Sequence, residues 1–107
     1  MDYFSDYRKH MGVNSTHFFK STIFQSERML IGMDCLEPGQ VQPPHRHAGR
    51  DKCYFVIAGQ GRFQVGDMLY TGQAGALVWA PADIVHAVEN IGTERLVMLI
   101  AMAPEPG

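Results

Sequence analysis

Short runs of apolar residues alternate with turn residues along most of this 107-residue chain. The runs are rich in β-branched, aromatic and long aliphatic side chains, and glycine, proline or aspartate interrupts them about every 8 to 12 positions. This spacing is typical of all-β sandwiches and barrels, and no alternation of strands with helices indicates a parallel sheet. The pattern therefore predicts an all-β fold in a single domain over residues 1–107.

The N-terminal part is expected to form an arm followed by two paired strands. Four apolar residues stand at near-helical spacing before Gly12: Tyr3, Phe4, Tyr7 and Met11. They predict a short N-terminal helix or arm within residues 1–16. Residues 17–24 and 28–37 follow as strand-like runs on either side of a polar break, and we expect them to pair with each other.

The rest of the chain has the pattern of strands joined by turns. Gly59-Gln60-Gly61 separates the strand-like runs 53–58 and 62–65 and predicts a tight β-hairpin. Further strand-like runs are separated by turn residues at positions 66–67, 72–75, 81–83 and 91–93. Residues 103–107 contain two prolines, which lack a backbone donor, so this segment is predicted to be a terminal tail.

The charge distribution favours a small-molecule partner over nucleic acid. The net charge is -2, and the nine lysine and arginine residues are scattered rather than clustered, whereas nucleic-acid binding requires a basic patch. The N-terminal segment is polar and lacks the apolar core of a secretory signal, and no run approaches the ~20 apolar residues of a membrane span. We therefore expect a cytoplasmic protein with no nucleic-acid or membrane partner.

Three histidines carry the candidate chemistry. Residues 39–47 read G-Q-V-Q-P-P-H-R-H. Because residues two apart on a strand project from the same face, His45 and His47 are expected to point into one cavity. His86 lies in a second strand-like segment after a turn. Three neutral imidazoles suit a divalent metal and leave one or more positions open for water or substrate.

The two segments resemble the paired motifs of the cupin family. The first motif has a glycine, five residues, HxH, three or four residues, an acid, six residues and a glycine; it is matched by Gly39, His45, His47 and Gly59. The second has a glycine, five residues, PxG, two residues, a histidine, three residues and an asparagine; it is matched by Gly75, Pro81, His86 and Asn90. The resemblance covers about residues 36–104 and implies a cupin jelly-roll barrel, a double-stranded β-helix.

The sequence departs from these motifs at two positions. Asp83 stands in place of the second glycine of the second motif, and Lys52 stands at the acidic position of the first. If the family register holds, Lys52 enters the pocket beside the metal. If the register shifts by one residue, Asp51 supplies a carboxylate ligand instead. The candidate ligands are therefore the three histidines with Asp51, which is expected to be an occasional ligand or a partner of the ligands.

Tyr54 and Lys52 are the candidate catalytic residues. Tyr54 lies two residues beyond Lys52 and hence on the same face of a regular strand. In the similar metal-dependent cupin lyases, such as those that cleave dimethylsulfoniopropionate, a tyrosine two positions after the acidic ligand acts as base. The alternatives are a tyrosine that lines the barrel with its hydroxyl satisfied, and a surface lysine paired with an acid.

The resemblance implies one divalent transition metal per chain, namely Fe, Zn, Ni or Mn. It suggests an enzyme that acts on a small polar organic substrate by direct coordination to the metal, a dioxygenase first and a lyase or isomerase next. The alternative is a non-catalytic cupin that binds or senses a small molecule. We also expect a homodimer formed through the apolar strands of residues 17–36.

Overall fold

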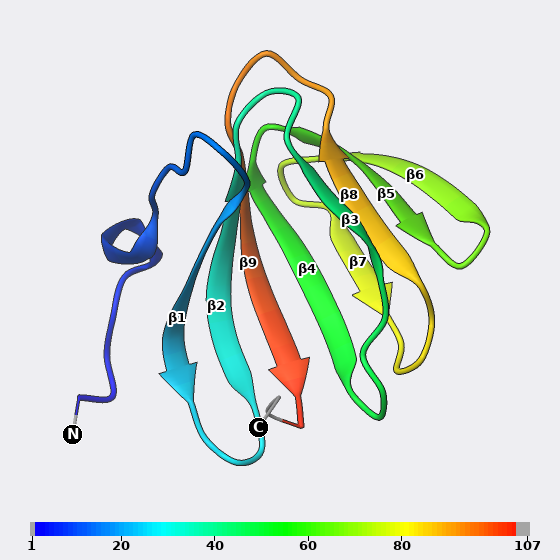
Figure 1. Ribbon diagram of the computed structural model, residues 1–107. Coiled ribbons are helices and arrows are strands. Elements are labelled where there is room, and N and C mark those ends of the chain that lie inside the picture. The colour runs from blue at the N-terminus through cyan, green and yellow to red at the C-terminus, as the bar shows by residue number, and fades with distance from the viewer. Residues whose placement is uncertain (1, 105–107) are drawn as a thin grey trace.

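The structure, a computed structural model, describes residues 2–104 as nine β-strands and one short 3-10 turn (Figure 1). The turn is η1 (Tyr7–His10), and the strands are β1 (Phe19–Gln25), β2 (Leu30–Leu36), β3 (Val41–His45), β4 (Asp51–Ala58), β5 (Gln60–Val65), β6 (Met68–Gln73), β7 (Leu77–Ala80), β8 (His86–Asn90) and β9 (Leu96–Ala103). The prediction of an all-β fold is confirmed.

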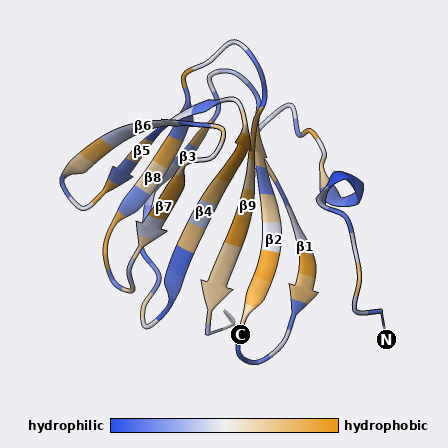
Figure 2. Ribbon diagram, turned by 180° about the vertical axis from the view of Figure 1, so that it is seen from behind, coloured by the Kyte–Doolittle hydropathy of each residue, from blue (hydrophilic) through white to orange (hydrophobic). Residues whose placement is uncertain are grey.

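The strands form two antiparallel sheets that lie face to face. One sheet has five strands in the order β1-β2-β9-β4-β7, and the other has four in the order β3-β8-β5-β6. The two sheets come closest at one end and spread apart toward the other (Figure 1). In Figure 2, β9 is apolar along its length whereas β4 begins with a hydrophilic segment. A polar region therefore lies among otherwise apolar central strands.

Alternate residues of each strand fill the space between the sheets, as the two-residue period of a strand requires. In β4, Tyr54 and Val56 point inward and are 1% and 0% exposed, whereas Phe55 between them is 38% exposed. The apolar side chains buried between the sheets belong to Leu36, Tyr54, Val56, Phe63, Val78, Ala80, Val88, Leu96, Met98, Ile100 and Met102. This core determines which face of β4 points inward, and Lys52 lies on the same face as Tyr54 and Val56.

The N-terminal segment is an arm that covers part of the outer face of the five-stranded sheet. The predicted helix is only the 3-10 turn η1, which packs against β1 and β2. Tyr7 and Met11 cover a second apolar cluster, centred on Met33, Cys35 and Val97. Because of this cover, β2 is buried on both faces. Within residues 2–104, no helix is long and apolar enough to cross a membrane.

The predicted hairpin at Gly59 is wrong. β4 pairs with β7 and β9 in one sheet, whereas β5 pairs with β6 and β8 in the other. The chain crosses between the sheets at Gly59, whose φ is +88° and where an added Cβ would lie 2.5 Å from the carbonyl oxygen of Arg95. Glycine is therefore required by a crossing rather than by a tight turn. A hairpin does form one strand later, between β5 and β6.

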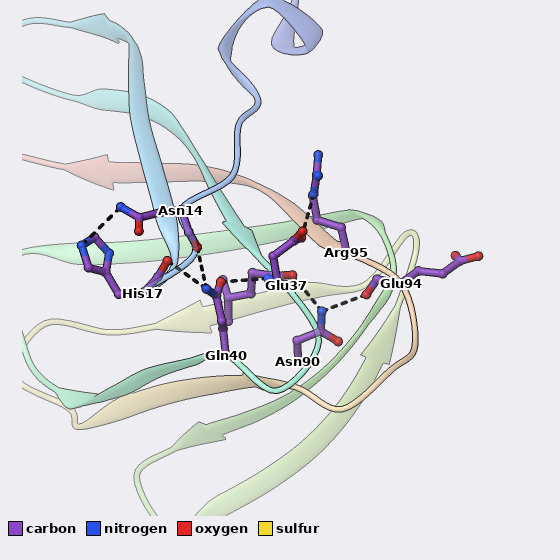
Figure 3. Close-up of polar contacts among 8 residues, drawn as sticks. Asn14, His17, Glu37, Gln40, Asn90, Glu94 and Arg95 are labelled. Carbon is purple, nitrogen blue, oxygen red and sulfur yellow. Dashed lines mark hydrogen bonds and ion pairs between the residues drawn. The ribbon is translucent and has the colours of Figure 1, made fainter.

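Asn90, the last residue of the second motif, has a structural role. Its Nδ2 donates to the carbonyl oxygens of Leu36 and Glu94, at 2.8 Å each, and its Oδ1 accepts from the backbone N–H of Gly92 at 2.9 Å. Figure 3 shows the contact of Asn90 with Glu94 among the loops at one end of the barrel. With three hydrogen bonds made and 1% exposure, Asn90 joins β2 to the loop before β9 and is far more suited to holding loops than to chemistry.

Candidate metal centre

A β-bulge at Pro43 and Pro44 turns His45 toward the interior. Gln42 pairs with Val88 and His45 pairs with His86, so two prolines on β3 lie opposite one residue on β8. In a regular strand, Gln42 and His45 would point to opposite faces of the sheet because they are three positions apart, whereas the extra residue of the bulge brings them to the same face. Prolines suit this site because they have no N–H to lose from the ladder. The sequence therefore points both side chains into the barrel.

The three predicted histidines are brought together. His45 and His86 lie directly opposite each other across the β3–β8 ladder, and their ring centroids are 4.2 Å apart. His47 follows in the loop after β3, with its ring 4.9 Å from that of His45 and 5.4 Å from that of His86. One nitrogen from each ring lies within 4.8 Å of the others. The three histidines therefore form a group that could hold a metal ion.

The second motif also holds His47 through Asp83. Asp83 has a φ of +68°, in the left-handed region that aspartate tolerates better than most residues. Its backbone N–H donates to the carbonyl oxygen of His47 at 2.9 Å. The replacement of glycine at this position therefore preserves the turn, and the turn supports the loop that carries His47.

Hydrogen bonds to the backbone determine which nitrogens face one another. The Nδ1 of His45 lies 2.8 Å from the carbonyl oxygen of Pro43, and the Nδ1 of His86 lies 3.0 Å from that of Ile84. A carbonyl can only accept, so each Nδ1 carries the proton and each Nε2 presents a lone pair. The Nε2 atoms of His47 and His86 are buried and have no hydrogen-bond partner within residues 2–104. Such orphaned polar atoms are costly unless something binds them.

The surroundings favour the neutral form of His47 and His86. Burial, followed by the charges of His45 and Lys52, lowers the pKa of His47 from 6.5 to about 4. Burial also lowers the pKa of His86, although its hydrogen bond to Ile84 opposes that shift. Neutral imidazole is the form that binds metals, so at neutral pH His47 and His86 need no deprotonation to act as ligands. The residues present fit a divalent transition metal.

The structure does not bring Asp51 to the histidines. Asp51 is exposed at the start of β4, and its Oδ1 accepts a hydrogen bond of 2.8 Å from the backbone N–H of Ala82. The metal-binding group that forms among the described residues contains His45, His47 and His86 alone. Asp51 instead connects the start of β4 to the turn of the second motif. The same turn supports His47 through the backbone N–H of Asp83.

Lys52 is the residue of β4 that enters the interior. It is 5% exposed, and its Nζ lies 3.5 Å from the Oδ2 of Asp34 and 4.6 Å from the centre of the Tyr54 ring. Burial lowers the pKa of the Lys52 ammonium, and the carboxylate of Asp34 partly offsets this shift. The sequence left two alternatives for Lys52, a position in the pocket and a position at the surface. The structure places it in the interior, paired with the buried carboxylate of Asp34.

Tyr54 is held by a buried polar network. Its hydroxyl donates to the Oε1 of Gln42 at 2.6 Å, and the Nε2 of Gln42 donates to the Oδ2 of Asp34 at 3.1 Å. Burial, followed by the charge of Asp34, raises the pKa of Tyr54. Because its proton is engaged and its anion disfavoured, these surroundings work against the predicted role of base. The hydroxyl is satisfied within the barrel.

Sequence reasoning missed Asp34 and Gln42. Asp34 is a single acid in an apolar strand. Gln42 shares the inner face with His45 because of the bulge between them. A proline pair within a strand, directly after a polar residue, is the signal that could have identified Gln42.

A cavity of about 760 Å³ opens beside the histidines. His45 and His47 line it together with Asp34, Gln42 and Lys52, and apolar walls are provided by Phe18, Leu30, Ile100 and Met102. A space of this size lies in the usual range for small-molecule sites. The arrangement combines an open set of nitrogen ligands, a buried cation and apolar walls.

Comparison with known proteins agrees with this geometry. Residues 32–102 match the family described as Cupin domain, and the chain belongs to that family. It is 34% identical to the protein TT1209 from Thermus thermophilus, a solved structure that it matches with a TM-score of 0.91 over 96% of this chain and 98% of that one. It is also 30% identical over 83 residues to an uncharacterized protein of Streptomyces coelicolor, covering 77% of this chain and 78% of that one.

The fold likeness extends to more distant proteins. A Klebsiella pneumoniae protein described as having a double-stranded β-helix domain matches with a TM-score of 0.92 at 19% identity, over 99% of this chain and 93% of that one. The predicted cupin fold is confirmed. The three histidines are positioned to hold a metal ion within it.

Proposed function

We propose that this cupin is an enzyme that acts on a small polar organic substrate at a divalent metal held by His45, His47 and His86. The observation that carries the proposal is the pair of buried Nε2 atoms on His47 and His86 without hydrogen-bond partners. Leaving a buried acceptor unpaired costs about 1–3 kcal/mol, and a cation bound between the rings would remove this cost. Three imidazoles suit iron, zinc or nickel better than manganese, which prefers oxygen ligands.

When bound, such an ion would supply Lewis acidity, with dioxygen chemistry in the case of iron and lyase or isomerase chemistry in the case of zinc or nickel. The chain supplies the rest of the site. The carbonyl groups of Pro43 and Ile84 orient two of the rings. The cavity offers apolar walls to the body of the substrate, and Lys52 presents a positive group to it. We rank oxygenase chemistry first and lyase or isomerase chemistry next.

A cupin that binds a small molecule without turning it over is the second candidate. The observation that favours it is the state of Tyr54, whose hydroxyl proton is engaged by Gln42 and whose anion is disfavoured by burial. Lys52 and Asp34 also line the cavity and could exchange a proton, but they are paired with each other.

Metal stoichiometry tests the proposal. The purified protein is stripped with a chelator, reloaded with Fe²⁺, Zn²⁺ or Ni²⁺, and measured by elemental analysis and titration calorimetry. We expect about one divalent ion per chain. His45→Ala should weaken binding by roughly ten-fold or more, because one of three ligands is lost. His45 is only half-buried, so this variant should fold.

His17→Ala is the matched control, because His17 is exposed and lies outside the histidine group. It should bind metal as the wild type does. Absence of stoichiometric metal, or equal binding by the two variants, would overturn the proposal. The metal-loaded protein is then assayed for oxygen consumption and for turnover of small organic acids. Thermal stabilisation by a compound that is never turned over would favour the second candidate.

A further inference from the structure

The cavity beside the histidines has an excess of positive charge. Lys20, Lys52 and Asp34 are the charged side chains among the described residues that line it, so with neutral imidazoles its formal charge is +1. A divalent ion on the histidines would raise this to +3. Since no carboxylate belongs to the histidine group, the ligands leave the charge of such an ion uncompensated. This field attracts an anion more strongly than a neutral ligand and repels a cation.

Lys52 is built into the site rather than free at the surface. Its side chain is 6% exposed, and its ammonium is paired with Asp34 across 3.5 Å. The other described contact of the ammonium is the face of the Tyr54 ring. An ammonium has three N–H donors, and Asp34 can engage one of them through the oxygen that also accepts from Gln42. Donors therefore remain for a group that enters the cavity.

Lys52 lies close enough to the histidines for one ligand to reach both. Its Nζ lies 4.6 Å from the centre of the Tyr54 ring, and the centre of that ring lies 6.3 Å from the centre of the His86 ring. Lys52, His45 and His47 line the same cavity of about 760 Å³. The apolar walls opposite these groups suit a ligand with a hydrocarbon or aromatic body.

From these observations we infer that the cavity takes an organic anion, a small carboxylic acid whose carboxylate is held by Lys52 beside the histidine centre. The inference rests on the proposed function and names its substrate class. Asp34 positions the lysine, and its own negative charge opposes the bound anion. Lys52 is thus an anion anchor at the position where the first motif has an acid.

Paired ligands that differ only in charge test the inference without any substitution. Mandelate and its neutral amide mandelamide have the same shape and an aromatic body that the cavity can hold. Titration calorimetry of the Zn²⁺-loaded protein should give at least about ten-fold tighter binding of mandelate, the difference expected for a charge-assisted hydrogen bond in a buried site. The metal-free protein should keep a smaller preference of the same sign, because Lys52 remains.

Two variants that break the same ion pair separate charge from structure. Lys52→Gln removes the positive charge and should weaken mandelate binding about ten-fold, with mandelamide binding unchanged. Asp34→Asn removes the opposing negative charge and should strengthen mandelate binding by a few-fold. If the pair had only a structural role, both variants would weaken binding. Circular dichroism and melting curves confirm that each variant is folded.

The inference is overturned if wild-type protein binds the amide as tightly as the acid, or if the two variants shift mandelate binding in the same direction. Metal content is measured on the same samples. Absence of metal counts against the proposed function, and the preference of the metal-free protein for mandelate then decides the inference. Presence of metal without a preference for mandelate counts against the inference alone.

Discussion

At the scale of single residues, the site depends on the nitrogen at which each histidine is protonated. The carbonyl groups of Pro43 and Ile84 hold protons on the Nδ1 atoms of His45 and His86. This leaves a lone pair on the Nε2 atom of each of these two rings, and in the part of the chain that the structure describes the buried Nε2 atoms of His47 and His86 have no hydrogen-bond partner. Buried polar atoms in folded proteins nearly always have a hydrogen-bond partner, so two such atoms without one are typical of a site that binds a ligand.

The metal-free protein should lose stability as the pH falls from about 6.5 to about 4. In the folded state the pKa of His47 is lowered to about 4, against an ordinary value of 6.5. Between these values the unfolded chain binds more protons than the folded one, so the free energy of unfolding decreases as the pH falls. His86, whose pKa is also lowered, acts in the same direction. Urea unfolding of the metal-free protein at pH 7, 6, 5 and 4 measures the effect.

Variants assign this pH dependence to the site. His47→Asn removes one titrating group, so its stability should depend less steeply on pH over this window. His17→Asn changes an exposed histidine and should retain the wild-type dependence. A His47→Asn profile parallel to that of the wild type would show that His47 titrates at the same pH in both states.

At the scale of elements, the bulge and the turns determine which side chains meet. The histidines could be predicted from the sequence because all three match the paired motifs, although His47 lies in the loop after β3 rather than on the strand. The inward residue of β4 could not be predicted, because the loop of residues 46–50 interrupts that parity. In the structure, Tyr54 and Val56 pack in the core and so determine the inner face of β4. Lys52 lies on the same face and therefore points inward.

Strand pairing was also only partly predictable. The pairing of β1 with β2 follows from two apolar runs around a short polar break, and it is confirmed. The crossing at Gly59 has the same local sequence as a hairpin turn, and only contacts with β9, distant in sequence, distinguish the two. Asp34 meets Lys52 across strands that are separated along the chain. Such long-range contacts carry no local signal.

Gly59→Ala should be strongly destabilising, by about 2–4 kcal/mol. The φ of Gly59 is +88°, and the added Cβ would also collide with the backbone of Arg95 and Leu96. Gly49→Ala is the matched control, because Gly49 has a φ of +70° with open space around it. It should cost only the strain of the left-handed conformation, about 1 kcal/mol. Urea unfolding at pH 7 measures both variants, and equal losses would contradict the steric account of the crossing.

At the scale of the whole molecule, the outer face of the five-stranded sheet is covered at one end and bare at the other. The N-terminal arm covers the cluster around Met33 and Cys35 and lies beside β1 (Figure 1). At the other end, Leu77 and Trp79 are 68% and 64% exposed. Phe55 pairs directly with Leu77, so these side chains form one apolar patch across β4 and β7. Apolar patches of this kind mark contact sites in many proteins.

We predict that the protein is a homodimer that covers this patch. The sequence placed the contact on residues 17–36, but β1 contains a bulge after Thr22, and bulged edge strands pair poorly with a second copy. Light scattering should find a dimer at micromolar concentration. Trp79→Lys should weaken it by at least about ten-fold, since an aromatic residue at the centre of an interface contributes about 2 kcal/mol or more.

Phe24→Lys places the same charge on an exposed apolar residue of β1 and serves as the matched control, so it should leave the dimer intact. A monomeric wild type would contradict the prediction. A dimer that dissociates in Phe24→Lys but persists in Trp79→Lys would move the contact to β1. In the expected arrangement, the cavity stays accessible, because the patch lies on the outer face of β4 whereas Lys52 and the histidine centre lie on the inner side.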